Sequence, residues 1–360
     1  MSVINFGAGP AKLPREVMLK VKDELLDFDG QGISIMEMSH RCPEYDRFNN
    51  KIEQLVREQL SVPDNYKIFF LQGGGTALFA AVAMNLMGRT GTADYFVTGS
   101  WSAKAAKEAA KYGKVNLVLP KTDQYIGVPD KSTWNLSPNA SYVYYCDNET
   151  IHGVEFPFIP EVGDVPLVAD MSSNILTRRF DVSKFGVIFA AAQKNIGPPG
   201  VVLVIAREDL LGNPLPITPL VMDFTVNAKD KSVHNTPPTF SFYVLGLVFE
   251  WCKAFGGLDE MEKKAKWKSE AVYDVINRSN GFYSCLVKPE YRSKMNATFK
   301  IRVPELEAQF LSEAKKLGMI QLKGHRSVGG IRVSLYNAIT LDEVKVLVKF
   351  MEEFYNKNKI

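Results

Sequence analysis

Lys194 lies at the end of an apolar stretch, Ile188 to Ala192, and is followed by the constrained segment Gly197-Pro-Pro-Gly200. Burial at the end of a strand disfavours the charged ammonium, which lowers the pKa of the amine and makes it a better nucleophile. A surface lysine whose aliphatic stem covers apolar neighbours is the alternative. That alternative does not explain so constrained a loop, and we therefore predict that Lys194 is a nucleophilic amine.

Asp170 directly follows a second apolar stretch, Val165 to Ala169. Open α/β sheets bind their ligands beyond the carboxyl ends of the strands, where this carboxylate is expected to lie. A carboxylate at this position also suits a cap for the turn Met171 to Ser173. Both interpretations of Asp170 stay open at the level of the sequence.

Three glycines, Gly73 to Gly75, separate the apolar strand Lys67 to Leu71 from the apolar helix predicted at Ala77 to Met84. Glycines at such a turn let backbone amides approach an anion, and the start of the helix adds partial positive charge. Thr76 adds a hydroxyl donor. No Gly-Lys-Ser/Thr follows and the spacing is not G-x-G-x-x-G, so a single phosphate fits better than a nucleotide. A tight turn without a ligand is the alternative.

These three features together match the needs of one cofactor, pyridoxal phosphate: a held phosphate, a carboxylate for the pyridine nitrogen and an amine for the aldehyde. Trp101 follows a predicted strand and is a candidate to lie on the pyridine ring, or else a core tryptophan. No metal site is expected, because the four histidines lack the spacing of metal ligands on a helix. No G-x-S-x-G motif for a serine hydrolase occurs either.

The composition is that of a globular protein of about two domains. The chain has 360 residues, 46% hydrophobic and 23% charged, with 43 basic and 40 acidic side chains. Such nearly equal numbers of basic and acidic side chains argue against nucleic acid or an anionic membrane as a partner. No signal peptide is visible and no run is long enough to span a bilayer. Four scattered cysteines are expected to be free thiols, and we expect a cytoplasmic protein.

Helical and strand-like segments alternate along the first two-thirds of the chain, which predicts an α/β fold around a mainly parallel sheet. Several predicted strands are continuous apolar runs, as expected for strands covered on both faces. The strands predicted in this part of the chain are 67–71, 93–97, 115–119, 141–145, 167–169, 187–191 and 201–205. Helices are predicted at 14–27, 49–60 and 102–111.

The pattern changes near Gly257 to that of a smaller α/β domain. Helices are predicted at 258–277 and 305–316, strands at 297–303 and 331–335, and a last helix after the capping box Thr340 to Glu343. The lysine run from Lys263 to Lys268 is interpreted as a solvated helix face. We predict a large cofactor-binding domain at 16–257 and a small domain formed by 1–15 and 258–360.

Six ordered motifs resemble the phosphoserine aminotransferase family, which belongs to class V of the fold type I pyridoxal phosphate enzymes. They are Asn5–Pro14, Met38–Arg41, Asn148–Gly153, Gln193–Gly197, Asn235–Phe240 and Gly324–Gly330, and they run from one end of the chain to the other. The resemblance implies a homodimer whose active sites take residues from both subunits. It also implies a transaminase of L-serine biosynthesis that converts 3-phosphohydroxypyruvate and glutamate into O-phosphoserine and 2-oxoglutarate.

The resemblance also implies roles for single residues. Lys194 matches the lysine that binds the cofactor covalently, Asp170 the partner of the pyridine nitrogen, and Trp101 the stacking aromatic. Other cofactor-binding positions are Gly75, Thr76, Thr150, Gln193, and, from the neighbouring subunit, Asn235 and Thr236. Substrate anions are assigned to His40, Arg41, His325, Arg326 and Arg332, with Arg332 on the α-carboxylate. Some relatives carry Arg in place of Thr76.

Two other functions remain to be weighed. A class V aminotransferase with a different amino donor, such as alanine with glyoxylate, would share the cofactor residues, but it would not need so many candidate anion-binding side chains. A phosphate- or nucleotide-binding protein without lysine chemistry would use only Gly73 to Gly75. A yellow protein that borohydride bleaches would exclude the second.

Overall fold

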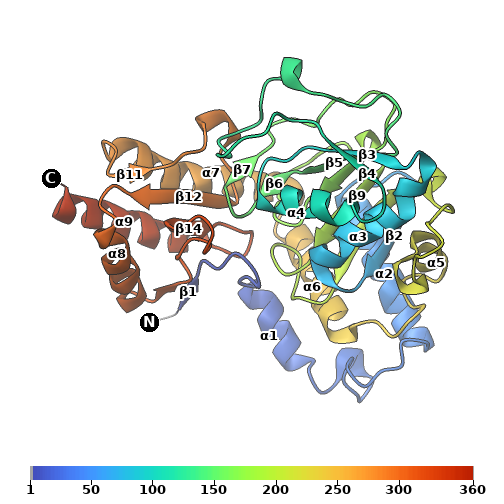
Figure 1. Cartoon of the computed structure of the whole chain (residues 1–360). Helices are drawn as coiled ribbons and strands as arrows, with labels where there is room; N and C mark the ends of the chain where they lie inside the picture. Colours follow the sequence, from blue (N-terminus) through green and yellow to red (C-terminus); the bar gives the residue numbers. More distant parts are fainter. Residues whose placement is uncertain (1–2, 360) are drawn as a thin grey trace.

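The computed structural model describes residues 3–359, and a seven-stranded sheet is its centre (Figure 1). The strands lie in the order β2-β10-β9-β8-β5-β3-β4. Their bounds are β2 (Tyr66–Leu71), β3 (Thr92–Tyr95), β4 (Lys114–Leu117), β5 (Val143–Cys146), β8 (Leu167–Asp170), β9 (Val187–Ala191) and β10 (Val202–Arg207). Only β10 is antiparallel to its neighbours, β2 and β9, so six of the strands share one direction. The prediction of a mainly parallel sheet is confirmed.

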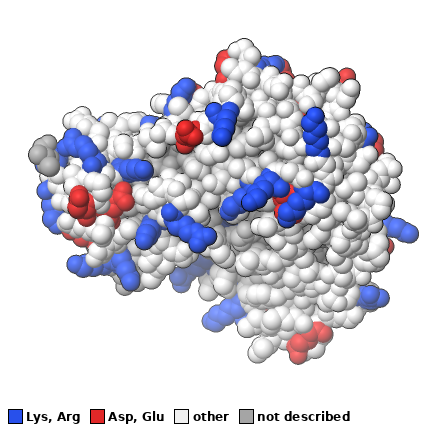
Figure 2. Space-filling model, viewed as in Figure 1, with Lys and Arg blue, Asp and Glu red and all other residues white. Residues whose placement is uncertain are grey.

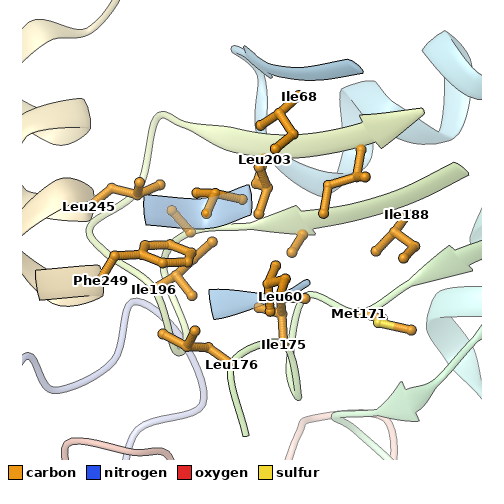
Figure 3. Close-up of a cluster of buried hydrophobic side chains, with 14 of the residues drawn as sticks. Leu60, Ile68, Met171, Ile175, Leu176, Ile188, Ile196, Leu203, Leu245 and Phe249 are labelled. Atoms are coloured by element: carbon orange, nitrogen blue, oxygen red, sulfur yellow. The ribbon is translucent and has the colours of Figure 1, made fainter. Parts of the chain in front are cut away.

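Helices cover both faces of this sheet. One face packs against α1 (Arg15–Asp23), α2 (Pro43–Gln59) and α6 (Thr239–Ala254), and the other against α3 (Gly74–Leu86), α4 (Ser100–Ala109) and α5 (Phe224–Lys229). Figure 3 shows the first interface, where Leu203 of β10 lies toward Leu245 and Phe249 of α6, and Ile188 of β9 lies on the other side near Met171. Burial on both faces explains why these strands read as continuous apolar runs.

A second lobe follows Gly256 and lies to one side of the large sheet in Figure 1. It contains a three-stranded antiparallel sheet, β11 (Tyr283–Ser284), β12 (Asn296–Ile301) and β14 (Ile331–Ser334). Its helices are α7 (Gly257–Arg278), α8 (Glu305–Lys316) and α9 (Leu341–Asn358). The N-terminal strand β1 (Ile4–Asn5) pairs in parallel with β13 (Met319–Ile320), which attaches the start of the chain to this small lobe.

A short hairpin, β6 (Asn148–Glu149) and β7 (Val154–Glu155), extends from the large sheet toward the small lobe. Its turn lies against the small lobe, because the Ser293 amide donates to Gly153 O and Thr298 Oγ1 donates to His152 O. The hairpin therefore carries residues from the end of β5 to the junction of the lobes. No helix within residues 3–359 is long and apolar enough to cross a membrane.

The capping box at the start of α9 is confirmed, with Thr340 Oγ1 accepting from the Glu343 amide and the Glu343 carboxylate accepting from the Thr340 amide. The interpretation of the α7 lysines as a solvated face is wrong for Lys268. Its side chain is buried and donates to the carbonyls of Tyr336 and Ile339. A lysine can be buried when its donors find acceptors, and here the turn after β14 supplies them.

Candidate active site

The residues predicted for the cofactor converge at one edge of the large sheet. Six strands share a direction, so their carboxyl ends meet at this edge. The segments that follow these ends carry Gly75 after β2, Trp101 after β3, Thr150 after β5 and Lys194 after β9, while Asp170 ends β8. The arrangement is the usual ligand-binding position of open α/β sheets.

Lys194 is held in place by hydrogen bonding and by the N-terminal segment. Its Nζ donates to Thr150 Oγ1 at 2.6 Å. Gly9 lies so near that an added Cβ would meet Lys194 Cγ at 3.3 Å, and the Ala11 amide donates to the carbonyl of the neighbouring Gln193 at 2.9 Å. The amine is thus directed at a defined point between the sheet edge and the small lobe.

Asp170 is 5% exposed, and its Oδ1 accepts from the Ser172 amide at 2.9 Å. It therefore caps the turn, as one interpretation of the sequence expected, and it also lies at the ligand-binding edge. Burial raises the pKa of Asp170, and the positive charge of Lys194 opposes that rise. Burial likewise lowers the pKa of Lys194, opposed first by Asp170. Each charge is therefore costly alone and supported by the other.

Trp101 is the second residue of α4, and its indole faces the amine. Lys194 Nζ lies 5.5 Å from the centre of the ring, and Lys104 Nζ lies 4.3 Å from it. Phe79 of α3 packs at 6.4 Å, centre to centre. The buried Nε1 of Trp101 has no hydrogen-bond partner within the described chain. Unpaired buried donors are rare, so this one suggests that a further group completes the site.

The start of α3 presents backbone amides to the same space. Gly73 adopts a φ of 95°, and no side chain caps the helix there. The nearest atoms to a Cβ added at Gly75 are Ala191 Cβ at 3.8 Å and Ser172 Oγ at 3.9 Å, so this turn lies beside the ends of β8 and β9. Thr76 is exposed. An anion can therefore be held by the amides and the hydroxyl of this turn.

These features fit pyridoxal phosphate. The desolvated amine of Lys194 and the carboxylate of Asp170 stand at the sheet edge, Trp101 offers a flat face, and the uncapped start of α3 suits a phosphate. The buried Nε1 of Trp101 is unpaired within the described chain and is available to a bound polar group.

A cavity of about 290 Å³ lies between the loop 123–126, the hairpin turn at Ile151 and His152, and the small lobe. His325 and Arg332 of the small lobe line it, together with His152 from the hairpin turn. Arg332 Nη1 donates to the carbonyl of Thr150 at 3.3 Å. Burial lowers the pKa of Arg332, and burial with the nearby Arg332 charge lowers that of His325. The lowered pKa values favour the neutral form of both histidines. Arg332 and Lys300, opposed by Asp123, are therefore the side chains of the lining that suit an anionic substrate.

His152 was not predicted as a site residue, although it lies in the quoted motif Asn148 to Gly153. Its Nε2 is 2.9 Å from Ser100 Oγ, and its ring meets Tyr125 edge to face at 4.8 Å. Burial lowers the pKa of His152 to about 4, and His325 contributes. Its place two residues after Thr150 was the available signal, but only the structure turns its ring into the cavity lining.

Five other predicted residues lie in loop segments and are partly or fully exposed. His40 and Arg41 follow the loop after α1 and within residues 3–359 contact only each other and Ser39 through polar atoms. Thr236, next to Asn235, is exposed, and its carbonyl accepts from Gln72 Nε2 near the start of α3. Arg326 is exposed near His325. Within residues 3–359, no hydrogen bond links these five residues to the amine of Lys194.

Figure 2 shows Lys and Arg side chains gathered over α4 and along the junction of the two lobes. Arg332 comes from β14 and Lys104 from α4, on opposite sides of that junction. Basic side chains therefore lie on this face near the junction, although the whole chain carries a net charge of only +3.

Comparison with protein families finds one model, described as aminotransferase class-V, that matches residues 3–347. A Drosophila melanogaster protein named phosphoserine aminotransferase is 60% identical over 99% of this chain and 100% of its own length. Both comparisons cover almost the whole chain.

Solved structures agree. A phosphoserine aminotransferase from Bacillus circulans subsp. alkalophilus superposes with a TM-score of 0.95 at 41% identity, covering 98% of each chain. A phosphoserine aminotransferase from Trichomonas vaginalis, described as bound to PLP, has a TM-score of 0.94 at 38% identity and covers 97% of this chain and 99% of its own.

Proposed function

The chain belongs to the class V aminotransferase family, and from that premise we propose that it transfers the amino group of glutamate to 3-phosphohydroxypyruvate. The products are O-phosphoserine and 2-oxoglutarate, and the reaction is a step of L-serine biosynthesis. The observation that carries the proposal is the desolvated amine of Lys194, placed between Asp170 and the face of Trp101 at the carboxyl edge of the sheet.

Pyridoxal phosphate supplies an aldehyde that takes up the amino group and a ring that withdraws electrons from the substrate Cα. Lys194 Nζ would be the amine that binds the aldehyde. The amides of Gly75 and Thr76 would hold the phosphate, Trp101 would offer its face to the ring, and Thr150 and Gln193 would border the cofactor. Asn235 and Thr236 reach the phosphate from the partner subunit.

Lys194 also moves the proton. With the cofactor bound, a free Nζ would be the group placed to accept the proton from the substrate Cα and to give it back, as general base and acid. The low pKa of the buried amine favours the neutral form that accepts a proton. Thr150 Oγ1, at 2.6 Å, fixes the point from which the amine acts.

Asp170 keeps a proton on the ring nitrogen by offering a negative charge in a buried position. Although burial raises the pKa of Asp170, the hydrogen bond from the Ser172 amide favours the ionised form. A cationic partner at the ring nitrogen stabilises it further. The turn cap and the catalytic role therefore use the same carboxylate, the Ser172 amide setting its orientation.

The substrate residues must accept a phosphate in one half-reaction and a carboxylate in the other. Charge-assisted hydrogen bonds from Arg and His suit both anions. Arg332 takes the α-carboxylate in each half-reaction, which its position beside Thr150 supports. His325 and Arg326 bind the distal anion at the junction of the lobes. His40 and Arg41 of the partner subunit bind the same anion.

We further propose a homodimer and a cytoplasmic location. Large apolar side chains are exposed around the loop before His40, among them Leu26 at 81% and Met36 at 54%, and a second copy of the chain would cover them. The domain limits proposed are 16–257 for the large domain, and 1–15 with 258–360 for the small one, supported by the pairing of β1 with β13. The small-molecule substrates need no further partner.

One experiment tests the reaction. The purified yellow protein is mixed with O-phosphoserine alone, and the 3-phosphohydroxypyruvate released is measured against the amount of bound cofactor. We expect about one equivalent without 2-oxoglutarate and continuous turnover with it. Transamination between alanine and glyoxylate, with no reaction of O-phosphoserine, would contradict the substrate assignment. Loss of colour on borohydride treatment, with no reaction toward any amino donor, would contradict transamination itself.

A further inference from the structure

Glu149 is a buried carboxylate beside the proposed site to which no role has been given so far. It is 0% exposed and lies in the hairpin strand β6, next to Thr150. Buried carboxylates are costly unless they are paired or hydrogen-bonded. Within the described chain its partners are not cations but the first groups of α4.

Three hydrogen bonds join Glu149 to the start of α4. Oε2 accepts from the Trp101 amide at 3.0 Å, while Oε1 accepts from the Ser102 amide at 2.8 Å and from Ser102 Oγ at 2.6 Å. The first amides of a helix have no partner within the helix, and a negative charge is favourable there. Glu149 thus acts as an N-cap supplied from another element, 48 positions away from Trp101 in sequence.

Gly99 provides the space for this contact. A Cβ added at Gly99 would overlap the carboxylate carbon of Glu149. The φ of Gly99 is 179°, which any residue can adopt. Glycine is therefore required here by the close approach of Glu149 and not by its backbone conformation.

We propose that Glu149 is a positioning residue that sets the plane of Trp101 relative to the amine of Lys194. Its side chain fixes the backbone of Trp101, and the hydroxyl of the next residue, Thr150, holds Lys194 Nζ at 2.6 Å. Two adjacent residues thereby fix both the aromatic face and the nucleophile. The distance of 5.5 Å between the Trp101 ring centre and Nζ follows from this segment.

The consequence concerns any flat group held between the ring and the amine. Stacking depends on the separation and tilt of the planes, and a shift of about 1 Å at a catalytic site can cost about 10²-fold in rate. The identity of the flat group rests on the proposed function. The position of the Trp101 ring does not, and it can be measured in the full chain before any cofactor is added.

The test uses three variants that disturb the contact from different sides. Glu149→Gln replaces one acceptor oxygen by a donor, Ser102→Ala removes the hydroxyl donor, and Gly99→Ala pushes the carboxylate away while keeping it. Asp94→Asn is the matched control, because Asp94 of β3 is also 0% exposed and accepts from the amide and hydroxyl of one serine, Ser137. Ser102→Ala leaves the segment around Thr150 unaltered and is the mildest change.

Each protein is labelled with 5-fluorotryptophan, and the fluorine resonance of residue 101 is assigned by Trp101→Phe. We expect this resonance to shift in all three variants and to stay in place in the control, with and without pyridoxal phosphate. The dissociation constant for the cofactor should rise about 10-fold for Glu149→Gln, equivalent to about 1.4 kcal/mol, and about 3-fold for Ser102→Ala.

An unmoved resonance in the folded variants, or an equal shift in Asp94→Asn, overturns the proposal. If Glu149→Gln does not fold, Ser102→Ala and Gly99→Ala decide in the same way. Should the wild-type protein show no transamination while the resonance still shifts in the variants, the proposed function fails and the positioning role stands.

Discussion

The two halves of the proposed site are built by different means. Lys194, Asp170, Thr150 and Trp101 are positioned by strand ends of one sheet and by hydrogen bonds within one chain. His40, Arg41, Asn235 and Thr236 lie in loops and, within the described residues, make no hydrogen bond with the amine. Electron withdrawal and proton transfer need fixed distances, which a sheet edge supplies. Recognition of an anion needs only charges that converge, and a second subunit can supply those.

Removing Lys194 should break the first half completely. In Lys194→Ala we expect transamination to fall by at least about 10³-fold, because both the covalent attachment and the proton transfer are lost. Pyridoxal phosphate should still bind through the phosphate and ring contacts. After borohydride treatment, mass spectrometry should find the cofactor attached to wild type but not to the variant. Lys184→Ala, at an exposed lysine, is the control. Near-normal turnover with added amines excluded would remove the assignment.

The Asp170→Asn variant separates the two roles of this carboxylate. Asparagine can keep the hydrogen bond from the Ser172 amide, so the turn should survive while the negative charge is lost. We expect removal of the Cα proton to slow about 10²-fold, within the range for a lost charge interaction of about 3 kcal/mol. The rate is read from a half-reaction with substrate deuterated at Cα. A wild-type rate would reduce Asp170 to a turn cap.

Arg41 tests whether the second half comes from the partner. Losing one charge-assisted hydrogen bond of about 1.5–3 kcal/mol should weaken O-phosphoserine about 10- to 150-fold in Arg41→Ala. Added salt should weaken binding to wild type more than to the variant. Both effects are measured as the half-saturating O-phosphoserine concentration at constant cofactor absorbance.

Mixed dimers sharpen the result. When Lys194→Ala and Arg41→Ala chains are unfolded and refolded together, one site in each mixed dimer joins an intact Lys194 to an intact Arg41 of the other chain, so about a quarter of wild-type activity should return. The same mixture with Arg332→Ala should recover nothing, because Arg332 contacts Thr150 of its own chain. Recovery in neither mixture would place Arg41 and Lys194 of one chain at the same site.

His152 should show the smallest effect, on stability. Its pKa in the folded chain is about 4, below the ordinary value of 6.5. Between these values the unfolded chain binds a proton that the folded chain does not, so the free energy of unfolding falls as pH drops from 6.5 to 4. We expect the free energy of unfolding of His152→Asn to fall by about 1–2 kcal/mol less than that of wild type over this pH range. This figure allows for solvent screening at a partly exposed ring. The free energy of unfolding is measured by urea denaturation at pH 4.5 and 7.5. An equal change between the two pH values in wild type and variant would contradict the assignment.

Much of the fold was predictable because its elements carry strong local signals. The strand Val187–Ala191 and the helix Glu305–Lys316 match their predicted bounds to the residue. The helix α6 received no prediction, since Thr239–Ala254 is apolar on most sides and lacks a clear period. Likewise, Lys268 lies in a run of lysines that looks solvated, and only the carbonyls of a distant turn account for its burial.

What the sequence determined by itself is the α/β fold, the cofactor class and the family, because apolar runs, glycine turns and six ordered motifs are local properties of the chain. Only the tertiary structure decided that His152 lines the cavity and that Glu149 reaches Trp101 across 48 positions. Those contacts join segments that are distant in sequence, and their energies come from burial and from hydrogen bonds that form only when the sheet edge and the hairpin are assembled.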